Sequence, residues 1–488
     1  MSSCRLLPPL EKVFAFNCPL LLVMAVDQVA ALEAYGIPVA TINGTTPLPE
    51  RKAIIEDLLS GHPKTRLLYV TPEFCCTETF RRNLIRIHAQ GELNRVAIDE
   101  AHCISEWGHD FRPAYKELSW FRKTFTSPLV PITALTATAT PKVRDDVVKL
   151  LGLDRTSIKW FHTPSARPNI HYEVRYIEGI EEDDDEEEKR VQDLLQWLDF
   201  VRNRHHTRHN RDSCSTDTNV KPPPISGIVY VPLRSVADEL ARILSCSGRD
   251  IHAIAYHAGL PASERKRIQN MWASKDTTAD DMNQQNGAPR PAFSIVVATN
   301  AFGMGIDNPH VRFVVHWTPP RSFEGLVQES GRAGRDGRAA VSIIYYNRNE
   351  RDRVFERLKK DENPHGGRAG NRYAPQSANS KARSLQARVE SFGKVIAFCE
   401  ATNRCRHQII KEFSGDLELE NIMSSQTTDQ ASCSSSSSSS PCDFACDVCK
   451  YGPEKISRQK KDMLKFTAQL EAAVMAAMLP GYESFWSF

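Results

Sequence analysis

The feature that most constrains this chain is the run from Val96 to His102, where an apolar, strand-like stretch ends in two adjacent carboxylates, Asp99 and Glu100. Nucleotide hydrolases hold magnesium with such a pair at the carboxyl end of a strand. In that chemistry Asp99 holds the ion through its water shell, and Glu100 polarises the water that attacks the γ-phosphate. A strand that ends in a solvated acidic turn is the alternative, so further motifs must decide.

The next segment, residues 103–113, carries Trp107, His109, Phe111 and Arg112 where an ordinary connection carries Gly, Ser and Asn. Aromatic faces stack on unpaired bases, and a guanidinium pairs with phosphate. With these residues the chain resembles the RecQ family of DNA helicases, in which an aromatic-rich loop after the DEAH box couples DNA contact to ATP hydrolysis.

Four further stretches resemble RecQ helicase motifs in family order. They are motif III at 134–139 (ALTATA), motif IV at 256–260 (YHAGL), motif V at 297–307 (VATNAFGMGID) and motif VI at 328–337 (QESGRAGRDG). The resemblance covers roughly residues 20 to 450. It implies an ATP- and Mg²⁺-dependent 3′–5′ DNA helicase in the nucleus. Such an enzyme acts on single-stranded and junction-containing DNA in repair, recombination or replication.

The resemblance also implies roles for individual residues. The catalytic set is Asp99, Glu100, His102, Arg332 and Arg335. Nucleotide contacts add Gly305, Asp307 and Gln328. The DNA-binding set is Trp107, His109, Phe111, Arg112, Thr136, Thr138 and His257.

Several of these residues also have a physical interpretation. Arg332 and Arg335, three apart, point from one face of a helix and can reach a phosphate cluster as arginine fingers do, although a surface arginine pair is the alternative. Gly305 permits close backbone approach to a ligand, although alone it marks an ordinary turn. Thr136 and Thr138 can hydrogen-bond the magnesium-site carboxylates or DNA phosphate, or simply pack.

The sequence departs from the family in its phosphate loop. A helicase of this type needs Gly-Lys-Ser or Gly-Lys-Thr after a glycine-rich loop. The only Gly-Lys pair is Gly393-Lys394, in a helical stretch, followed by Val395. Residues 18–29 resemble the segment that follows the phosphate loop in the family. We therefore expect the first strand, the loop and the first helix to be missing, and residues 1–17 resemble nothing in the family.

Alternating strands and amphipathic helices predict an α/β fold. The expected architecture is two RecA-like lobes, the first incomplete, followed by a small helical zinc-binding subdomain. The predicted boundaries are 1–165 for lobe 1, 166–346 for lobe 2, 347–455 for the zinc-binding subdomain and 456–488 for a tail. Within lobe 2 a disordered insertion is expected near 180–222, where Glu181 to Glu188 forms an acidic block.

A metal site is expected in the third region. Cys442, Cys446 and Cys449 offer three thiols, and Cys405 would be the fourth ligand. Such thiolate ligation is typical of structural, tetrahedral zinc (Zn²⁺), and it resembles the RecQ zinc-binding subdomain. Cys399 or Cys433 can substitute for one ligand, and reduced, uncoordinated thiols are the alternative.

Composition adds three limits. The net charge of +2 means that any DNA affinity must come from local patches. Thirteen cysteines scattered through these motifs fit reduced thiols better than a disulfide framework. The apolar stretch from Pro19 to Val26 is too short to span a membrane; a signal-peptide core is the less favoured interpretation because the stretch lies on a family motif.

Two functions remain open. One is a RecQ-family helicase whose printed chain lacks its phosphate loop and is therefore inactive as written. The other is an ATP-independent DNA-binding or scaffold protein derived from a helicase. An intact DEAH box (residues 99–102) and intact motifs III, V and VI favour the first, because a protein freed from hydrolysis has no use for Glu100 or Arg335.

Overall fold

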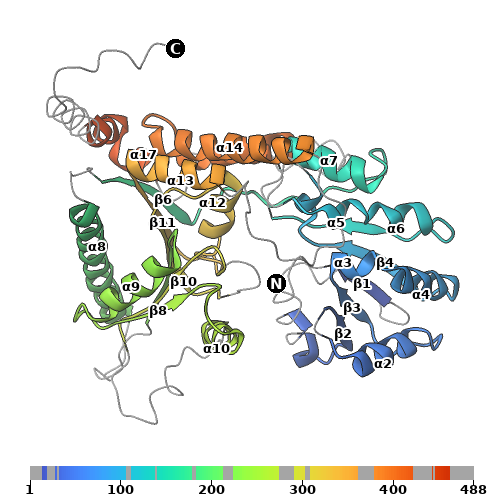
Figure 1. The fold of residues 1–488 in the computed structure, drawn as a ribbon. Helices are drawn as coiled ribbons and strands as arrows, with labels where there is room; N and C mark the ends of the chain where they lie inside the picture. Colours follow the sequence, from blue (N-terminus) through green and yellow to red (C-terminus); the bar gives the residue numbers. More distant parts are fainter. Residues whose placement is uncertain are drawn as a thin grey trace, which may run out of the picture.

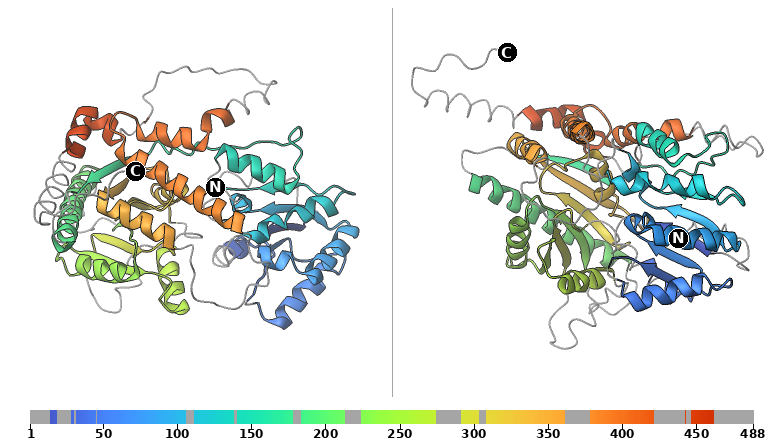
Figure 2. Two further views of the ribbon diagram at one scale, coloured as in Figure 1. Left: turned by 45° about the horizontal axis from the view of Figure 1, so that its top comes forward. Right: turned by 45° about the vertical axis from the view of Figure 1, so that its right-hand side comes forward.

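The computed structural model contains two β-sheets side by side, each made of parallel strands, with a helical layer along one side (Figure 1). It describes residues 14–18, 28–29, 32–44, 46–105, 111–137, 140–177, 183–212, 224–273, 291–302, 308–360, 378–420, 442 and 446–461. Figure 2 shows the helical layer from two further sides. Among the described helices, none has the length and apolar character that a membrane span needs.

The first sheet forms lobe 1, and all of its strands are parallel in the order β2-β3-β1-β4-β5. The strands are β1 (Phe14–Cys18), β2 (Val39–Ile42), β3 (Leu67–Val70), β4 (Leu93–Ile98) and β5 (Ile132–Ala134). The helices are α2 (Leu48–Leu58), α3 (Pro72–Cys75), α4 (Glu78–Ala89), η2 (Ala101–Ile104), α5 (Pro113–Lys116), α6 (Ser119–Thr124) and α7 (Pro141–Leu151). Their apolar faces form one core with the sheet.

Strand β1 corrects the expectation that lobe 1 lacks its first strand. Its backbone pairs with β3 on one side and with β4 on the other, so it lies at the centre of the sheet. Parallel strand pairing uses backbone hydrogen bonds, so it requires an extended backbone but no particular side chains. Residues that do not resemble the family can therefore occupy the position between β3 and β4. The segment after β1, residues 19–27, lies outside the described residues.

The second sheet forms lobe 2, again fully parallel, in the order β6-β11-β10-β7-β9-β8. Its strands are β6 (Ile170–Tyr176), β7 (Ile225–Tyr230), β8 (Ile251–Tyr256), β9 (Phe293–Ala298), β10 (Val311–His316) and β11 (Ala340–Tyr346). Its helices are α8 (Asp183–Asp212), α9 (Arg234–Ser245), α10 (Ala262–Ala273), α12 (Phe323–Ser330) and α13 (Arg348–Lys360). Separate cores cover the two faces, as expected for a parallel sheet.

Helix α8 occupies much of the region where we expected a disordered insertion, so that expectation is wrong for residues 183–212. Val191, Leu194, Leu195 and Leu198 are buried at helical spacing and pack into the core of lobe 2. The acidic block at the start of the helix is partly neutralised by buried Arg190, whose Nη2 lies 2.6 Å from Glu186. Acidic residues near a helix N-terminus also interact favourably with the helix dipole and so stabilise the helix.

A C-terminal subdomain packs on lobe 2. It contains α14 (Ala378–Glu400), α15 (Arg406–Ser414) and α17 (Asp447–Tyr451). Arg406 is fully buried, and its Nε and Nη2 donate to the two carboxylate oxygens of Asp447 at 2.9 and 3.0 Å. The same carboxylate accepts from the backbone N–H of Val174 in β6, at 3.0 Å. This buried pair therefore ties the subdomain to the edge of the lobe 2 sheet.

We predict that Arg406→Met destabilises the protein by about 3–5 kcal/mol, because it leaves the Asp447 carboxylate buried without its partner. The matched control is Arg404→Met, which breaks an ion pair with Glu412 whose side chains are 48% and 43% exposed. Exposed pairs contribute about 0–1 kcal/mol. Urea unfolding monitored by circular dichroism measures both variants. Equal losses of stability in the two would contradict the role assigned to Arg406.

Candidate functional site

The DEAH segment follows β4 directly and lies at the carboxyl edge of the lobe 1 sheet. Glu100 adopts a left-handed backbone conformation, φ 48° and ψ 44°, which is uncommon for a residue with a side chain and is often found at functional sites. Its Oε2 is buried and makes no hydrogen bond, although it lies 3.2 Å from His102 Nδ1. A buried carboxylate oxygen left unsatisfied is costly, so this geometry suits a group that awaits a ligand.

Asp99 beside it is also shielded from water. Burial, and next the negative charge of Glu100, raise the pKa of Asp99 to about 6. A bound divalent cation would favour the ionised carboxylate and so lower the pKa of Asp99. The Tyr115 hydroxyl holds the backbone here by donating to the Asp99 carbonyl at 3.0 Å.

His102 connects the DEAH segment to motif III. Its Nδ1 and the Thr136 hydroxyl lie 3.0 Å apart, within hydrogen-bonding distance. Thr136, expected to contact DNA, therefore serves at least to hold the DEAH histidine. Thr138 lies outside the described residues.

Two polar residues that the sequence analysis missed lie at the same edge. Asn43 follows β2 and Thr71 follows β3, and the carboxyl ends of parallel strands share one edge, where ligands bind in open α/β sheets. Asn43 is buried, and its carbonyl accepts from Arg51 Nη2 at 2.9 Å. The available signal was a polar residue directly after a short apolar strand, in ATIN and LLYVT.

The aromatic-rich loop is described only at its end, because Trp107 and His109 lie outside the described residues. Phe111 is half-buried, and the ammonium of Lys116 lies 5.0 Å from the centre of its ring. The backbone N–H of Arg112 donates to the Cys103 carbonyl at 2.9 Å. The loop therefore returns to the end of the DEAH segment.

Motif VI differs from the expectation of a helical arginine pair. Helix α12 ends at Ser330, so Arg332 and Arg335 lie in the turns that follow. Arg332 is buried, and its Nε has no hydrogen-bond partner. It lies close to Tyr230, where burial raises the pKa of the tyrosine and the positive charge of Arg332 opposes the shift. The two arginines share one loop, not a helical face.

Arg167 and Asn169, near the start of the predicted lobe 2, hold this loop in place. Arg167 Nη1 donates to the carbonyls of Gly331 and Ala333 at 2.8 and 3.0 Å, and its Nη2 donates to Gly334. Asn169 Nδ2 donates to the Gly334 carbonyl at 2.8 Å. Gly334 has φ 59°, and a Cβ there would lie 2.5 Å from Asn169 Nδ2, so glycine is required.

The remaining predicted residues of lobe 2 divide into three cases. Gly305 and Asp307 lie outside the described residues, and Gln328 is half-buried on α12. His257, expected to bind DNA, makes two contacts within the protein. Its Nε2 lies 3.1 Å from Asp238, and its Nδ1 accepts from the backbone N–H of Gly259 at 3.2 Å. Both ring nitrogens are thus engaged within the protein.

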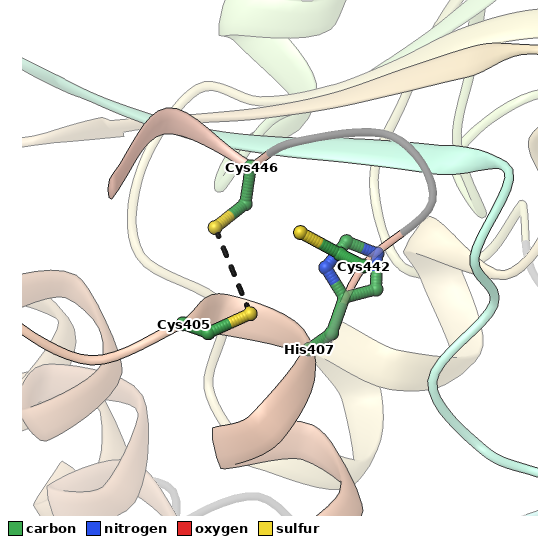
Figure 3. Close-up of side chains that lie close together, drawn as sticks. All are labelled: Cys405, His407, Cys442 and Cys446. Atoms are coloured by element: carbon green, nitrogen blue, oxygen red, sulfur yellow. Dashed lines mark hydrogen bonds between the residues drawn. The ribbon is translucent and has the colours of Figure 1, made fainter. Parts of the chain in front are cut away.

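A cluster of possible metal ligands lies at the N-terminal end of α15 (Figure 3). Cys405, His407, Cys442 and Cys446 are all buried, and their ligand atoms lie within 4.8 Å of one another. Hydrogen bonding with Cys405, and next burial, raise the pKa of Cys446 to about 11. A cation would favour the thiolate instead.

The cluster differs from the predicted ligand set in one member. Cys449 is exposed and lies outside this compact group, although its thiol interacts with those of Cys446, Cys405 and Cys442. His407, which the sequence analysis missed, lies in it. His407 Nε2 is 3.0 Å from the Ile170 carbonyl, and its buried Nδ1 has no partner. Donation from Nε2 to a carbonyl leaves a lone pair on Nδ1, as is usual for a metal-bound histidine. Thiolates and an imidazole fit zinc.

Comparison with known proteins identifies the class to which this fold and site belong. Residues 20–147 match the family model "DEAD/DEAH box helicase", and residues 221–337 match "Helicase conserved C-terminal domain". The chain therefore contains the two RecA-like lobes of a helicase.

Curated relatives narrow the family. The chain is 35% identical to rat ATP-dependent DNA helicase Q5 over 420 residues, covering 85% of this chain and 38% of that protein. It is 33% identical to Xenopus laevis RecQ-like DNA helicase BLM, covering 80% and 24%, and 32% identical to Schizosaccharomyces pombe ATP-dependent DNA helicase hus2/rqh1, covering 92% and 27%. The chain belongs to the RecQ family of DNA helicases. It spans well under half the length of these three relatives.

Proposed function

We propose that the chain is the core of an ATP-dependent 3′–5′ DNA helicase that acts in the nucleus during repair, recombination or replication. The observation that carries this proposal is the edge of lobe 1, where Asp99, Glu100, His102 and Thr136 are held together by the contacts described above. In the same proposal, residues 1–165, 166–346 and 347–455 are the two lobes and a zinc-binding subdomain, and residues 456–488 are a tail.

The residues would divide the work as follows. ATP with Mg²⁺ would supply the γ-phosphate whose transfer to water drives translocation. Asp99 would hold the ion through water, and Glu100 would polarise the attacking water. Arg332 and Arg335, placed by Arg167, would stabilise negative charge on the phosphates.

Nucleotide binding would also use Gln328, Gly305 and Asp307. The proposal for Gln328 is supported by its place on α12, directly before the loop of Arg332.

DNA contact is proposed for the loop of Trp107, His109, Phe111 and Arg112, with Thr138 on the neighbouring segment. Single strands are the expected ligand, because stacking on aromatic side chains needs unpaired bases. The proposal is supported by the half-exposed ring of Phe111 beside the ammonium of Lys116.

We predict that Phe111→Ala weakens single-stranded DNA binding by roughly 1–3 kcal/mol, the usual contribution of one stacked base. Fluorescence anisotropy with a labelled oligonucleotide at fixed salt measures the change. Phe200→Ala is the control, because Phe200 is 59% exposed on α8 of lobe 2. An unchanged affinity for Phe111→Ala would remove Phe111 from the DNA site.

A second candidate function is ATP-independent DNA binding or scaffolding. One observation favours it: the printed sequence contains no Gly-Lys-Ser or Gly-Lys-Thr. DNA binding together with a complete lack of ATP hydrolysis, even after a phosphate loop is supplied, would support this candidate over the helicase.

A further inference from the structure

Helix α7 of lobe 1 lies between two parts of the molecule that are far apart in sequence. Its Arg144 reaches the C-terminal subdomain, where Nη1 donates to the Ser414 carbonyl at 2.8 Å and Nη2 donates to Glu418 at 2.8 Å. We call these three residues the Arg144 latch. Ser414 is the last residue of α15, so the guanidinium binds a carbonyl at a helix C-terminus, where a positive charge is favoured.

The fit around the latch is close. Gly415 has φ 64°, and a Cβ there would lie 2.8 Å from Pro141 Cγ and 3.0 Å from Arg144 Nη2. The next residue, Asp416, is fully buried, and its carboxylate accepts from the backbone N–H and the hydroxyl of Ser165 at 2.9 and 3.0 Å. The C-terminal subdomain is thus tied to α7 and to the segment that leaves lobe 1.

The opposite side of α7 holds the DEAH segment. Asp146 Oδ2 accepts from the hydroxyl of Ser105 at 2.5 Å. Ser105 is fully buried, and its backbone N–H donates to the His102 carbonyl at 3.1 Å. Residues two apart in a helix point to different sides. Arg144 therefore binds the C-terminal subdomain, while Asp146, in the same turn, binds the DEAH segment.

We propose that α7 is a conformational relay that couples the C-terminal subdomain to the DEAH segment through Arg144, Asp146 and Ser105. The subdomain is attached to lobe 2 through Asp447, which Arg406 holds and which accepts from the backbone N–H of Val174 in β6. A movement of lobe 2 relative to lobe 1 would therefore strain the hydrogen bonds of Arg144 and shift α7. Through Asp146, that shift would reach Ser105, which directly precedes residues 106–110 of the aromatic-rich loop. The role of the relay in catalysis rests on the proposed function, but the existence of the relay does not.

Hydrogen–deuterium exchange of the full chain, without nucleotide or DNA, tests the relay. Arg144→Met removes both latch bonds and keeps the apolar stem. We expect roughly tenfold faster exchange at the end of α15, as loss of a charged hydrogen bond implies. A smaller increase is expected in η2 and α5. Ser105→Ala should accelerate exchange most in η2 and α5, with a smaller increase at the end of α15, because coupling between two sites is reciprocal.

The matched control is Arg155→Met. Arg155 Nη2 pairs with Asp145 Oδ1 of the same helix at 2.8 Å, but both side chains are 66% exposed, so neither region should change. If Arg144→Met does not fold, Glu418→Gln replaces it, because it weakens one bond and retains the bond to Ser414. Faster exchange at α15 with no change in η2 and α5 would overturn the relay. DNA affinity, measured separately with Phe111→Ala, tests the proposed function independently.

Discussion

The 488-residue polypeptide is expected to show no DNA-stimulated ATP hydrolysis and no unwinding, whatever its DNA affinity. The printed sequence lacks the Gly-Lys-Ser or Gly-Lys-Thr whose backbone amides and lysine hold the phosphates. Positioning and electrostatic stabilisation dominate phosphoryl transfer. Without a phosphate loop, the DEAH carboxylates and the motif VI arginines alone cannot orient a triphosphate for attack.

Supplying a phosphate loop should reverse this result. Replacing residues 1–17 by a RecQ strand, phosphate loop and helix of roughly 40 to 60 residues should restore DNA-stimulated hydrolysis. It should also restore unwinding of a duplex with a 3′ tail in preference to one with a 5′ tail. The exchange replaces most of β1, so the new strand must take the place between β3 and β4.

Glu100→Gln in the restored chain provides the control, since it keeps the size of the side chain and removes its charge. Hydrolysis should fall to background. Robust ATP hydrolysis by the original 488-residue chain, lost in Glu100→Gln, would show that another segment replaces the phosphate loop.

Purified protein should contain about one zinc ion per chain, and loss of the ion should unfold the C-terminal subdomain. Structural zinc sites in small domains contribute apparent binding free energies of about 10–16 kcal/mol, which appear as folding free energy. Cys446→Ser should therefore abolish zinc binding and sharply reduce solubility. Inductively coupled plasma mass spectrometry gives the metal content, and circular dichroism with a chelator reports the unfolding.

Two variants separate the possible ligand sets. His407→Asn should lower zinc affinity if the compact buried group is the site, and Cys449→Ser should do so if the predicted thiol is the fourth ligand. Cys246→Ser is the control, because Cys246 is an exposed thiol at the end of α9. Well-folded protein without zinc would leave the four residues as reduced, packed side chains.

The sequence correctly predicted the α/β class, because apolar strands alternating with amphipathic helices have few other ways to bury both faces. It also located the DEAH carboxylates after a strand, since Val96–Ile98 is apolar and is followed at once by charge. These inferences depend on neighbours in the chain. The same local approach failed for α8, where an acidic block suggested disorder although Val191 and Leu194 begin a buried helical face.

Motif VI shows why local spacing was insufficient. The spacing of Arg332 and Arg335 fits one helical face, yet α12 ends at Ser330 and the loop is held by Arg167, more than 160 residues earlier in the chain. Backbone carbonyls freed from a helix need new donors, and a distant guanidinium provides them here. No periodicity in the sequence carries that information.

By itself, then, the sequence determined the order of the motifs, the class of the fold and the chemistry that its carboxylates, arginines and thiols can perform. Only the tertiary structure decided that β1 lies between β3 and β4, that His407 joins the cysteines, and that Arg144 joins lobe 1 to the C-terminal subdomain. The physical reason is that these contacts connect residues far apart in the chain. Their energy depends on how whole layers pack, and not on the preferences of neighbouring residues.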